Sequence, residues 1–105
     1  MNTNVEQVVV SMISSAGVGK SCAFEAVFLA KEGKFKEARE MIEQGEKELL
    51  KGSKEHAKLL AIEANEGLQL TLLVVHASNH LSNAELSLDF AKCMIDMYEE
   101  KSNNV

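Results

Sequence analysis

The stretch LQLTLLVVHASNHLSNAELSLDFAKCMIDMYEE, residues 68–100, decides the fold, because its apolar residues form two stripes at helical spacing instead of one. A lone amphipathic helix needs only one apolar stripe, so a helix with two is buried on two sides. We expect the rest of the chain to cover the first stripe and a partner chain to cover the second. The first stripe consists of Leu70, Val74, Ala77, Leu81, Ala84, Leu88, Ala91 and Ile95. The second consists of Leu68, Leu72, Val75, Asn79, Ser82, Leu86, Phe90, Cys93 and Met97.

The polar residue Asn79 lies inside the second stripe, seven residues after Leu72 and seven before Leu86. One buried asparagine in an otherwise apolar seam fixes the register and the oligomeric state of associating helices, at a cost in stability. The second stripe with Asn79 in it therefore indicates self-association through this helix.

Two further helical stretches precede residues 68–100, and glycine-containing breaks at Gly33 and at residues 65–67 separate the three. We predict helices at about residues 4–32, 35–65 and 68–100 within one all-α domain that spans residues 1–105. Small residues such as Gly17 and Gly19 let another helix approach closely, and residues 51–54 predict a kink or a continuation. The stripe of the first stretch is Val5, Val8, Val9, Met12, Ile13, Ala16, Ala23, Phe24, Val27 and Phe28. That of the second is Phe35, Ala38, Met41, Ile42, Leu49, His56, Leu59, Leu60 and Glu63, with Gly45 and Gly52 as small members.

Composition excludes several classes of protein. The 105 residues carry a net charge of −5, whereas binding to nucleic acid needs a basic face. The absence of proline favours long helices. Cys22 and Cys93 form neither a disulfide framework nor a Cys-x-x-Cys metal site. No apolar run approaches the roughly 20 residues that span a bilayer, and no positive flank of a signal peptide precedes Val5, so we expect a soluble, cytoplasmic protein.

The segment SAGVGKS at residues 15–21 is similar to a phosphate-binding loop. That motif needs glycine where Ser14 stands, and it follows a strand in an alternating strand–helix fold, which the chain does not show. We therefore interpret the segment as a small-residue patch on a packed helix.

His76 and His80 are four residues apart and so lie on one face of a helix, with about 6 Å between their Cβ atoms. One use of this spacing is metal binding, but Ala77 occupies the place of the glutamate that a zinc peptidase needs, and no third ligand is evident. Another use is nucleophilic catalysis, because a neutral imidazole can attack a phosphoryl group and carry it. A third is a satisfied core or interface histidine pair.

The run LLVVHASNHL at residues 72–81 resembles the Leu-Val-His-Ala-Gln-Asp-His-Leu signature of enzyme IIA of the lactose/cellobiose/diacetylchitobiose class, from the bacterial phosphoenolpyruvate-dependent sugar phosphotransferase system. ISSAG at residues 13–17, AKEGKF at residues 30–35 and ANEG at residues 64–67 are similar to other stretches of that family. The resemblance implies an antiparallel three-helix bundle that assembles as a homotrimer, with the third helices around the threefold axis. A histidine phosphotransfer domain of two-component signalling is not favoured, because no histidine of the chain begins a His-x-x-Lys-Gly pattern.

The resemblance also implies roles for individual residues. His76 would accept a phosphoryl group from the phosphocarrier HPr and pass it to a cysteine of a IIB component during β-disaccharide uptake, with His80 in support. Contact with the membrane would be indirect, through the IIC transporter. The family holds a divalent metal on the axis with an aspartate, where this chain has Asn79, so we expect no metal and no cofactor. Ser78 replaces the family's glutamine, and Gly52-Ser53 an Ala-His pair; His56 is not a motif residue. The alternative is a non-catalytic regulatory or scaffolding trimer of the same fold, with a vestigial His76.

Overall fold

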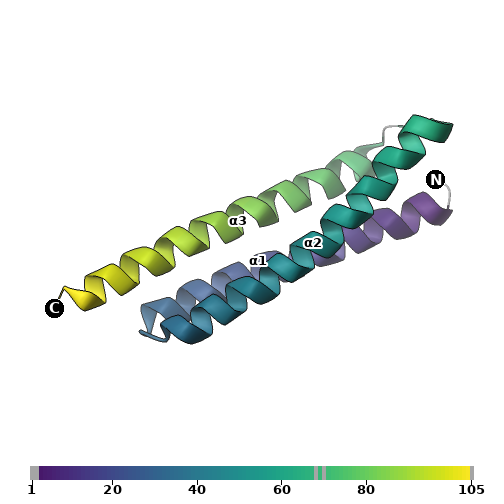
Figure 1. The fold of residues 1–105 in the computed structure, drawn as a ribbon. Helices are drawn as coiled ribbons and strands as arrows, with labels where there is room; N and C mark the ends of the chain where they lie inside the picture. The colour runs from purple at the N-terminus through teal and green to yellow at the C-terminus, as the bar shows by residue number, and fades with distance from the viewer. Residues whose placement is uncertain (1–2, 68, 70, 105) are drawn as a thin grey trace.

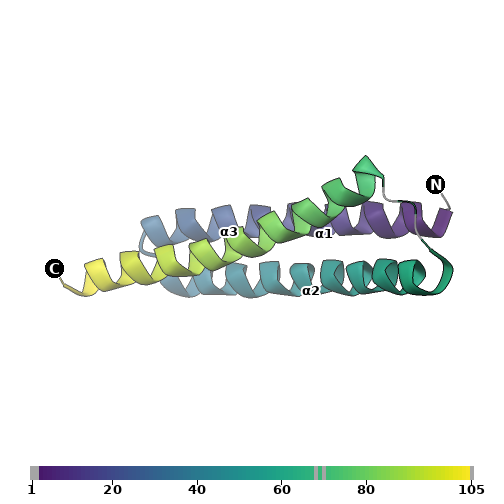
Figure 2. The ribbon, with the colours of Figure 1, turned by 90° about the horizontal axis from the view of Figure 1, so that it is seen from above.

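The computed structural model describes residues 3–67, 69 and 71–104, and this part of the chain is folded into helices without strands (Figure 1). The helices are α1 (Thr3–Lys31), α2 (Phe35–Glu66) and α3 (Leu72–Asn103). The chain forms a rod of 59 × 18 × 16 Å, in which α1 runs from right to left, α2 returns from left to right and α3 runs from right to left again (Figures 1 and 2). The C-terminal end of α3 extends past the turn between α1 and α2. The prediction of an all-α three-helix bundle is confirmed.

Glycines in the left-handed region end the first two helices. Gly33 has φ of +81° and Gly67 has φ of +77°. At the first turn the N–H of Gly33 donates to the carbonyl of Ala30 at 3.0 Å, and that of Lys34 donates to the carbonyl of Leu29 at 2.9 Å. These two bonds form a Schellman motif, which satisfies carbonyls at the helix end and reverses the chain in three residues.

The third helix begins at Leu72 rather than at residue 68 and runs to Asn103 rather than residue 100. Its start is fixed by Thr71, whose extended backbone and hydroxyl cap the helix by accepting a hydrogen bond from the N–H of Val74 at 3.2 Å. The stripe members Leu68 and Leu70 lie outside the described residues. The sequence signal for the later start was the threonine ahead of the periodic apolar residues.

The first stripe of α3 forms the core, since every described member is buried: Val74, Ala77, Leu81, Ala84, Leu88, Ala91 and Ile95. One cluster joins the N-terminal part of this stripe to Val9 and Met12 of α1. A second cluster, rich in alanine, joins the C-terminal part of the stripe to α1 and to Ile42 of α2. Complete burial of large side chains such as Met12 and Ile95 contributes about 1.5–3 kcal/mol each. The core therefore lies where the periodicity predicts it.

The second stripe of α3 is exposed in the single chain. The exposed fractions are 86% for Leu72, 54% for Leu86, 61% for Phe90 and 68% for Met97. Phe24 and Phe28 of α1 were predicted in the core stripe but are also exposed. Because their positions differ from the buried alanines of α1 by about 80–160° around the helix, they join the outer apolar surface instead.

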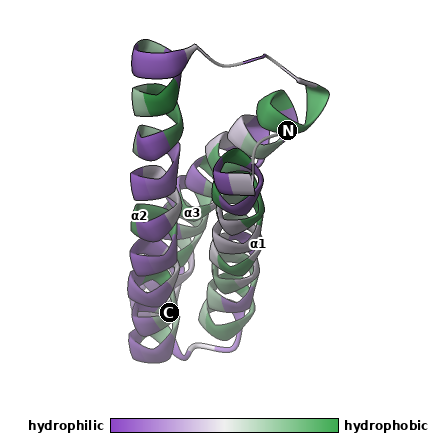
Figure 3. Cartoon of the chain, turned by 90° about the vertical axis from the view of Figure 1, so that its right-hand side faces the viewer, coloured by the Kyte–Doolittle hydropathy of each residue, from purple (hydrophilic) through white to green (hydrophobic). Residues whose placement is uncertain are grey.

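Helix α2 carries the polar outer surface of the bundle, as its colouring in Figure 3 shows. It is continuous through residues 51–54, so no turn interrupts it. Leu60 and Glu63, predicted in its stripe, are exposed. Leu60 lies about 100° around the helix from Leu59, which is buried in the core at this level of α2. Across to α3, Arg39 pairs with two carboxylates, at 3.1 Å with Asp96 and 2.6 Å with Glu99. Such exposed pairs contribute about 0.2–1 kcal/mol each.

Glycines bring α1 and α2 close together. A Cβ atom added to Gly45 would lie 3.0 Å from Cβ of Cys22, 2.7 Å from Cδ2 of Leu88 and 3.4 Å from the carbonyl oxygen of Gly19. Gly19 itself is buried against Gly45, as its small size predicts, whereas a Cβ added to Gly17 would meet nothing within 4 Å. The contact at Gly45 therefore depends on the missing side chain.

We expect Gly45→Ala to lower the free energy of unfolding by about 1–2 kcal/mol, because overpacking costs about 1–3 kcal/mol and the helix propensity of alanine returns up to about 1 kcal/mol. Gly17→Ala is the matched control and should stabilise by about 0.4–1 kcal/mol. Urea unfolding at one fixed protein concentration measures both. A Gly45→Ala protein as stable as the Gly17→Ala protein would show that the close approach is not needed.

Candidate functional site

His76 and His80 form a contact pair on α3. Their Nε2 atoms are 2.9 Å apart, a hydrogen bond in which one ring donates and the other accepts. The rings meet edge to face at 86°, with 4.4 Å between their centroids. His76 is exposed and His80 is half-buried. Because the His76 ring is exposed, a partner protein can reach it from outside the bundle, where Nε2 of His76 is hydrogen-bonded to His80.

The position of the pair follows from the helix. Met94 lies eighteen residues after His76, which is five full helical turns, so both project from the same side of α3. Met94 and Ser87 line a hollow together with Phe24 and Val27 of α1. The histidine pair therefore occupies the flank of α3 that turns toward α1, between the buried first stripe and the exposed second one.

Ser78 and Asn79 lie between the two histidines in the sequence, but their side chains take no part in the hydrogen bond between the two rings. The hydroxyl of Ser78 donates to the carbonyl of Val74 in the preceding turn, at 3.1 Å. This serine therefore bonds its own helix, unlike a longer side chain that could reach a bound group. Asn79 is exposed within the second stripe, as its heptad position predicts.

The metal that the family resemblance implies does not fit the residue at its position. Asn79 offers a neutral carboxamide, and hard divalent cations are held by several oxygen ligands, most often carboxylates. Within residues 3–67, 69 and 71–104, no group of three or more His, Cys, Asp or Glu side chains could hold a metal ion. We derive no step through a metal at Asn79.

The remaining sequence candidates do not join the histidine pair. Residues 15–21 are helical within α1, so they form no phosphate-binding loop. His56 is half-buried on α2. Burial, and then the negative charge of Glu48, raise the pKa of the Cys22 thiol, which keeps it protonated and a poor nucleophile. Cys93 is free and exposed in the second stripe.

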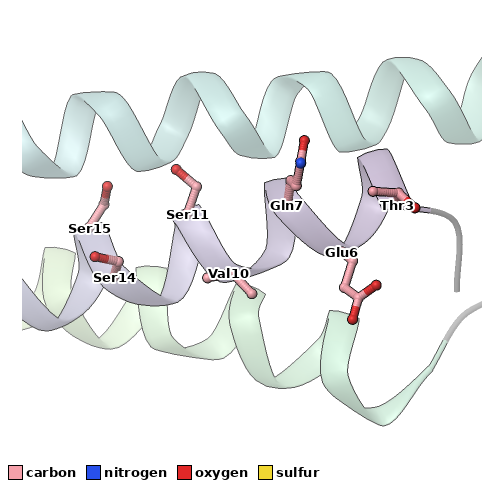
Figure 4. A pocket seen from close by; sticks show the side chains of 7 residues that line it. All are labelled: Thr3, Glu6, Gln7, Val10, Ser11, Ser14 and Ser15. Carbon is pink, nitrogen blue, oxygen red and sulfur yellow. The ribbon is translucent and has the colours of Figure 1, made fainter.

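A shallow hollow on α1 adds no chemistry of its own. Figure 4 shows its lining, which comes from one helix: Thr3, Glu6, Gln7, Val10, Ser11, Ser14 and Ser15. Glu6 is its one titratable side chain, and no hydroxyl of the lining is paired with a base among the hydrogen bonds of the described residues. We assign the site to the histidine pair.

None of the three helices, over their described residues, is long and apolar enough to cross a membrane.

Comparison with known proteins gives a consistent result over the whole chain. A family model described as "PTS system, Lactose/Cellobiose specific IIA subunit" matches residues 7–99. The lichenan-specific phosphotransferase enzyme IIA component of Bacillus subtilis (strain 168) is 39% identical over 101 residues, which are 95% of this chain and 92% of that protein.

Two solved structures share the fold. The PTS cellobiose-specific enzyme IIA from Bacillus anthracis aligns with a TM-score of 0.93 and 29% identity, covering 100% of this chain and 97% of its own. The IIA component in the solution structure of the IIA(chitobiose)–HPr complex of Escherichia coli aligns with a TM-score of 0.83 and 30% identity, covering 93% of this chain and 96% of its own.

Proposed function

This chain belongs to the family of lactose/cellobiose-specific IIA subunits of the sugar phosphotransferase system, and on that basis we propose that it carries phosphoryl groups on His76. The donor is the phosphocarrier HPr, and the acceptor is the cysteine of a IIB component that serves β-disaccharide uptake. The observation that carries the proposal is the exposed side chain of His76, whose Nε2 lies 2.9 Å from Nε2 of His80. The complex of a similar IIA component with HPr supports the choice of donor.

The pair has the chemistry that phosphoryl transfer needs. When Nε2–H of His80 donates, Nε2 of His76 keeps its lone pair and its ring carries its proton on Nδ1. The hydrogen bond from His80 breaks as the donor approaches, which frees that lone pair to attack phosphorus; the bond from phosphorus to the donor histidine breaks, and the electron pair stays on the donor's nitrogen. The donor ring takes up a proton as Nδ1 of His76 loses one. His80 then turns its N–H to an equatorial oxygen of the phosphoryl group, where positioned donors lower the barrier.

The proposal is tested by incubating the protein with phosphoenolpyruvate, enzyme I and HPr, and then measuring its intact mass under non-acidic conditions. We expect one phosphoryl group per chain, lost on acid treatment because phosphohistidine is acid-labile and phosphoserine is not. A chain that gains no phosphate would favour the alternative, a non-catalytic regulatory or scaffolding assembly in which His76 is vestigial.

We expect His80→Ala to slow phosphoryl acceptance by a factor of about 10²–10³ without abolishing it, because one transition-state donor is removed. His80→Gln keeps an N–H donor and should recover part of the rate. Rapid-quench transfer from phosphorylated HPr measures both variants, with His56→Ala as the control. Equal rates for wild type and His80→Ala would show that His80 has no part in phosphoryl acceptance.

We also propose that the protein is a homotrimer built around α3. Support comes from the exposure of the second stripe, where Leu72, Leu86, Phe90 and Met97 are all more than half exposed in the single chain. Burial of each such side chain contributes about 1.5–3 kcal/mol, and soluble monomers rarely expose a continuous apolar patch of this kind. Light scattering at low micromolar concentration should give about three times the 11.5 kDa of one chain. A mass of one chain would contradict the proposal.

A further inference from the structure

We propose that His76 and His80 also form a two-ligand site for a divalent transition-metal ion of the nickel or copper type, and that the bound ion blocks phosphoryl acceptance. The binding itself rests on the geometry of the pair, and the block rests on the function proposed above. The site differs from a metal position at Asn79, because its ligands are imidazole nitrogens on one chain rather than oxygens contributed by several.

The distance between the two rings suits right-angle coordination. Metal–imidazole bonds are about 2.0–2.1 Å long, so two Nε2 atoms 2.9 Å apart subtend about 90° at an ion between them. Square-planar and tetragonal nitrogen sites are typical of Cu²⁺ and Ni²⁺. Tetrahedral Zn²⁺ would require the nitrogens to separate to about 3.3 Å, so it fits less well.

The site is preorganised by the helix. Both rings project from a continuous part of α3 that is anchored on either side by Val74 and Leu81, which are buried. The edge-to-face arrangement, with centroids 4.4 Å apart, already brings the two Nε2 atoms together on one side of the helix. An ion bonded to both nitrogens at about 2.0–2.1 Å lies beside the line that joins them, so both rings turn toward it. The donating ring moves its proton from Nε2 to Nδ1, and both Nε2 lone pairs bind the ion in place of the hydrogen bond. Water fills the other coordination positions from the exposed side of His76.

Metal binding and phosphoryl acceptance require the same electrons. The lone pair on Nε2 of His76 is the nucleophile of the proposed transfer, and it is also one of the two metal ligands. An ion held by both rings leaves His76 without a nucleophile and His80 without an N–H on Nε2. The two states of the site are therefore mutually exclusive, and free transition metal would act as a reversible inhibitor.

The binding test is a titration with NiCl₂, monitored by calorimetry and by thermal unfolding. It is carried out on wild type, His76→Ala, His80→Ala and His56→Ala. We expect one ion per chain for wild type and for His56→Ala, a rise in melting temperature with nickel, and affinity at least tenfold weaker once either member of the pair is lost. Equal nickel affinity in wild type and His80→Ala would overturn the proposed site, whether or not the protein accepts phosphate.

The functional test uses phosphorylated HPr that has been separated from enzyme I, with increasing NiCl₂. We expect nickel to slow acceptance by wild type and by His56→Ala, and EDTA to reverse the effect. His80→Ala is slower at the start but should be insensitive to nickel, which also controls for any action of nickel on HPr. Nickel that binds wild type at the pair without slowing transfer would overturn the block. Nickel bound at the pair of a chain that accepts no phosphate would overturn the proposed function and leave the metal site standing.

Discussion

We expect replacement of His76 by alanine to remove phosphoryl acceptance altogether and to leave the helices intact. The first result is expected because His76 is the nucleophile of the proposed transfer and His80 supplies only a donor. The second is expected because the His76 side chain is exposed and its ring meets that of His80 on the surface of the same helix. Intact mass after incubation with phosphorylated HPr measures the first, and circular dichroism with thermal unfolding measures the second.

The matched control is His56→Ala, which removes a half-buried histidine of α2 and should leave acceptance at the wild-type rate. A His76→Ala protein that still gains one acid-labile phosphate would assign the nucleophile to another histidine. Loss of acceptance in both variants would point to a shared effect on folding, which the unfolding curves would reveal.

Asn79→Asp should make the assembly depend on divalent cations. In the proposed trimer, Asn79 faces its own copies from the neighbouring chains. Three amides need no neutralising ion, because each both donates and accepts hydrogen bonds. Three carboxylates held together repel one another unless a cation lies between them or some of them take up protons. We therefore expect the wild-type trimer to survive a chelator, and the variant trimer to weaken near neutral pH once metal is removed.

Light scattering with and without EDTA, for both proteins, measures this difference. Lowering the pH should restore the trimer of the Asn79→Asp variant in EDTA, because protonation of the carboxylates removes their mutual repulsion. Asn104→Asp adds the same charge beyond the last turn of α3 and should not create dependence on metal. Dissociation of the wild-type trimer by EDTA, or a stoichiometric metal held by Asn79 in a crystal, would contradict the proposal.

The core and the histidine face could be predicted from the sequence, because helical periodicity alone sorts residues by direction. Val74 and Ile95 are buried and Leu86 is exposed as that sorting requires. Phe24 and Phe28 were misplaced because spacing does not tell a core stripe from a neighbouring exposed one when both are apolar. The start of α3 was misplaced because the leucines before it continue the apolar pattern, whereas the cap at Thr71 depends on one hydroxyl and an extended backbone.

The candidate site was predictable only to the level of spacing. A separation of four residues places two Cβ atoms about 6 Å apart on one helix face, but the rotamers decide where the ring nitrogens lie. The 2.9 Å between the Nε2 atoms of His76 and His80, which requires one ring to donate and the other to accept and which sets the angle at a shared metal ion, is a property of the folded helix. The hydrogen bond from Ser78 to the carbonyl of Val74 likewise could not be predicted from the sequence.

The short connections between the helices have a consequence for how fast the molecule forms. The turn at Gly33 takes three residues, from Glu32 to Lys34, so α1 and α2 meet without closing a long loop. Chains dominated by contacts between consecutive helices fold in microseconds to milliseconds. Docking of separate subunits takes milliseconds to minutes and speeds up with concentration. In the proposed trimer, we therefore expect each chain to reach its helical bundle before it meets a neighbour, with the second stripe of α3 exposed to solvent for the whole of that interval.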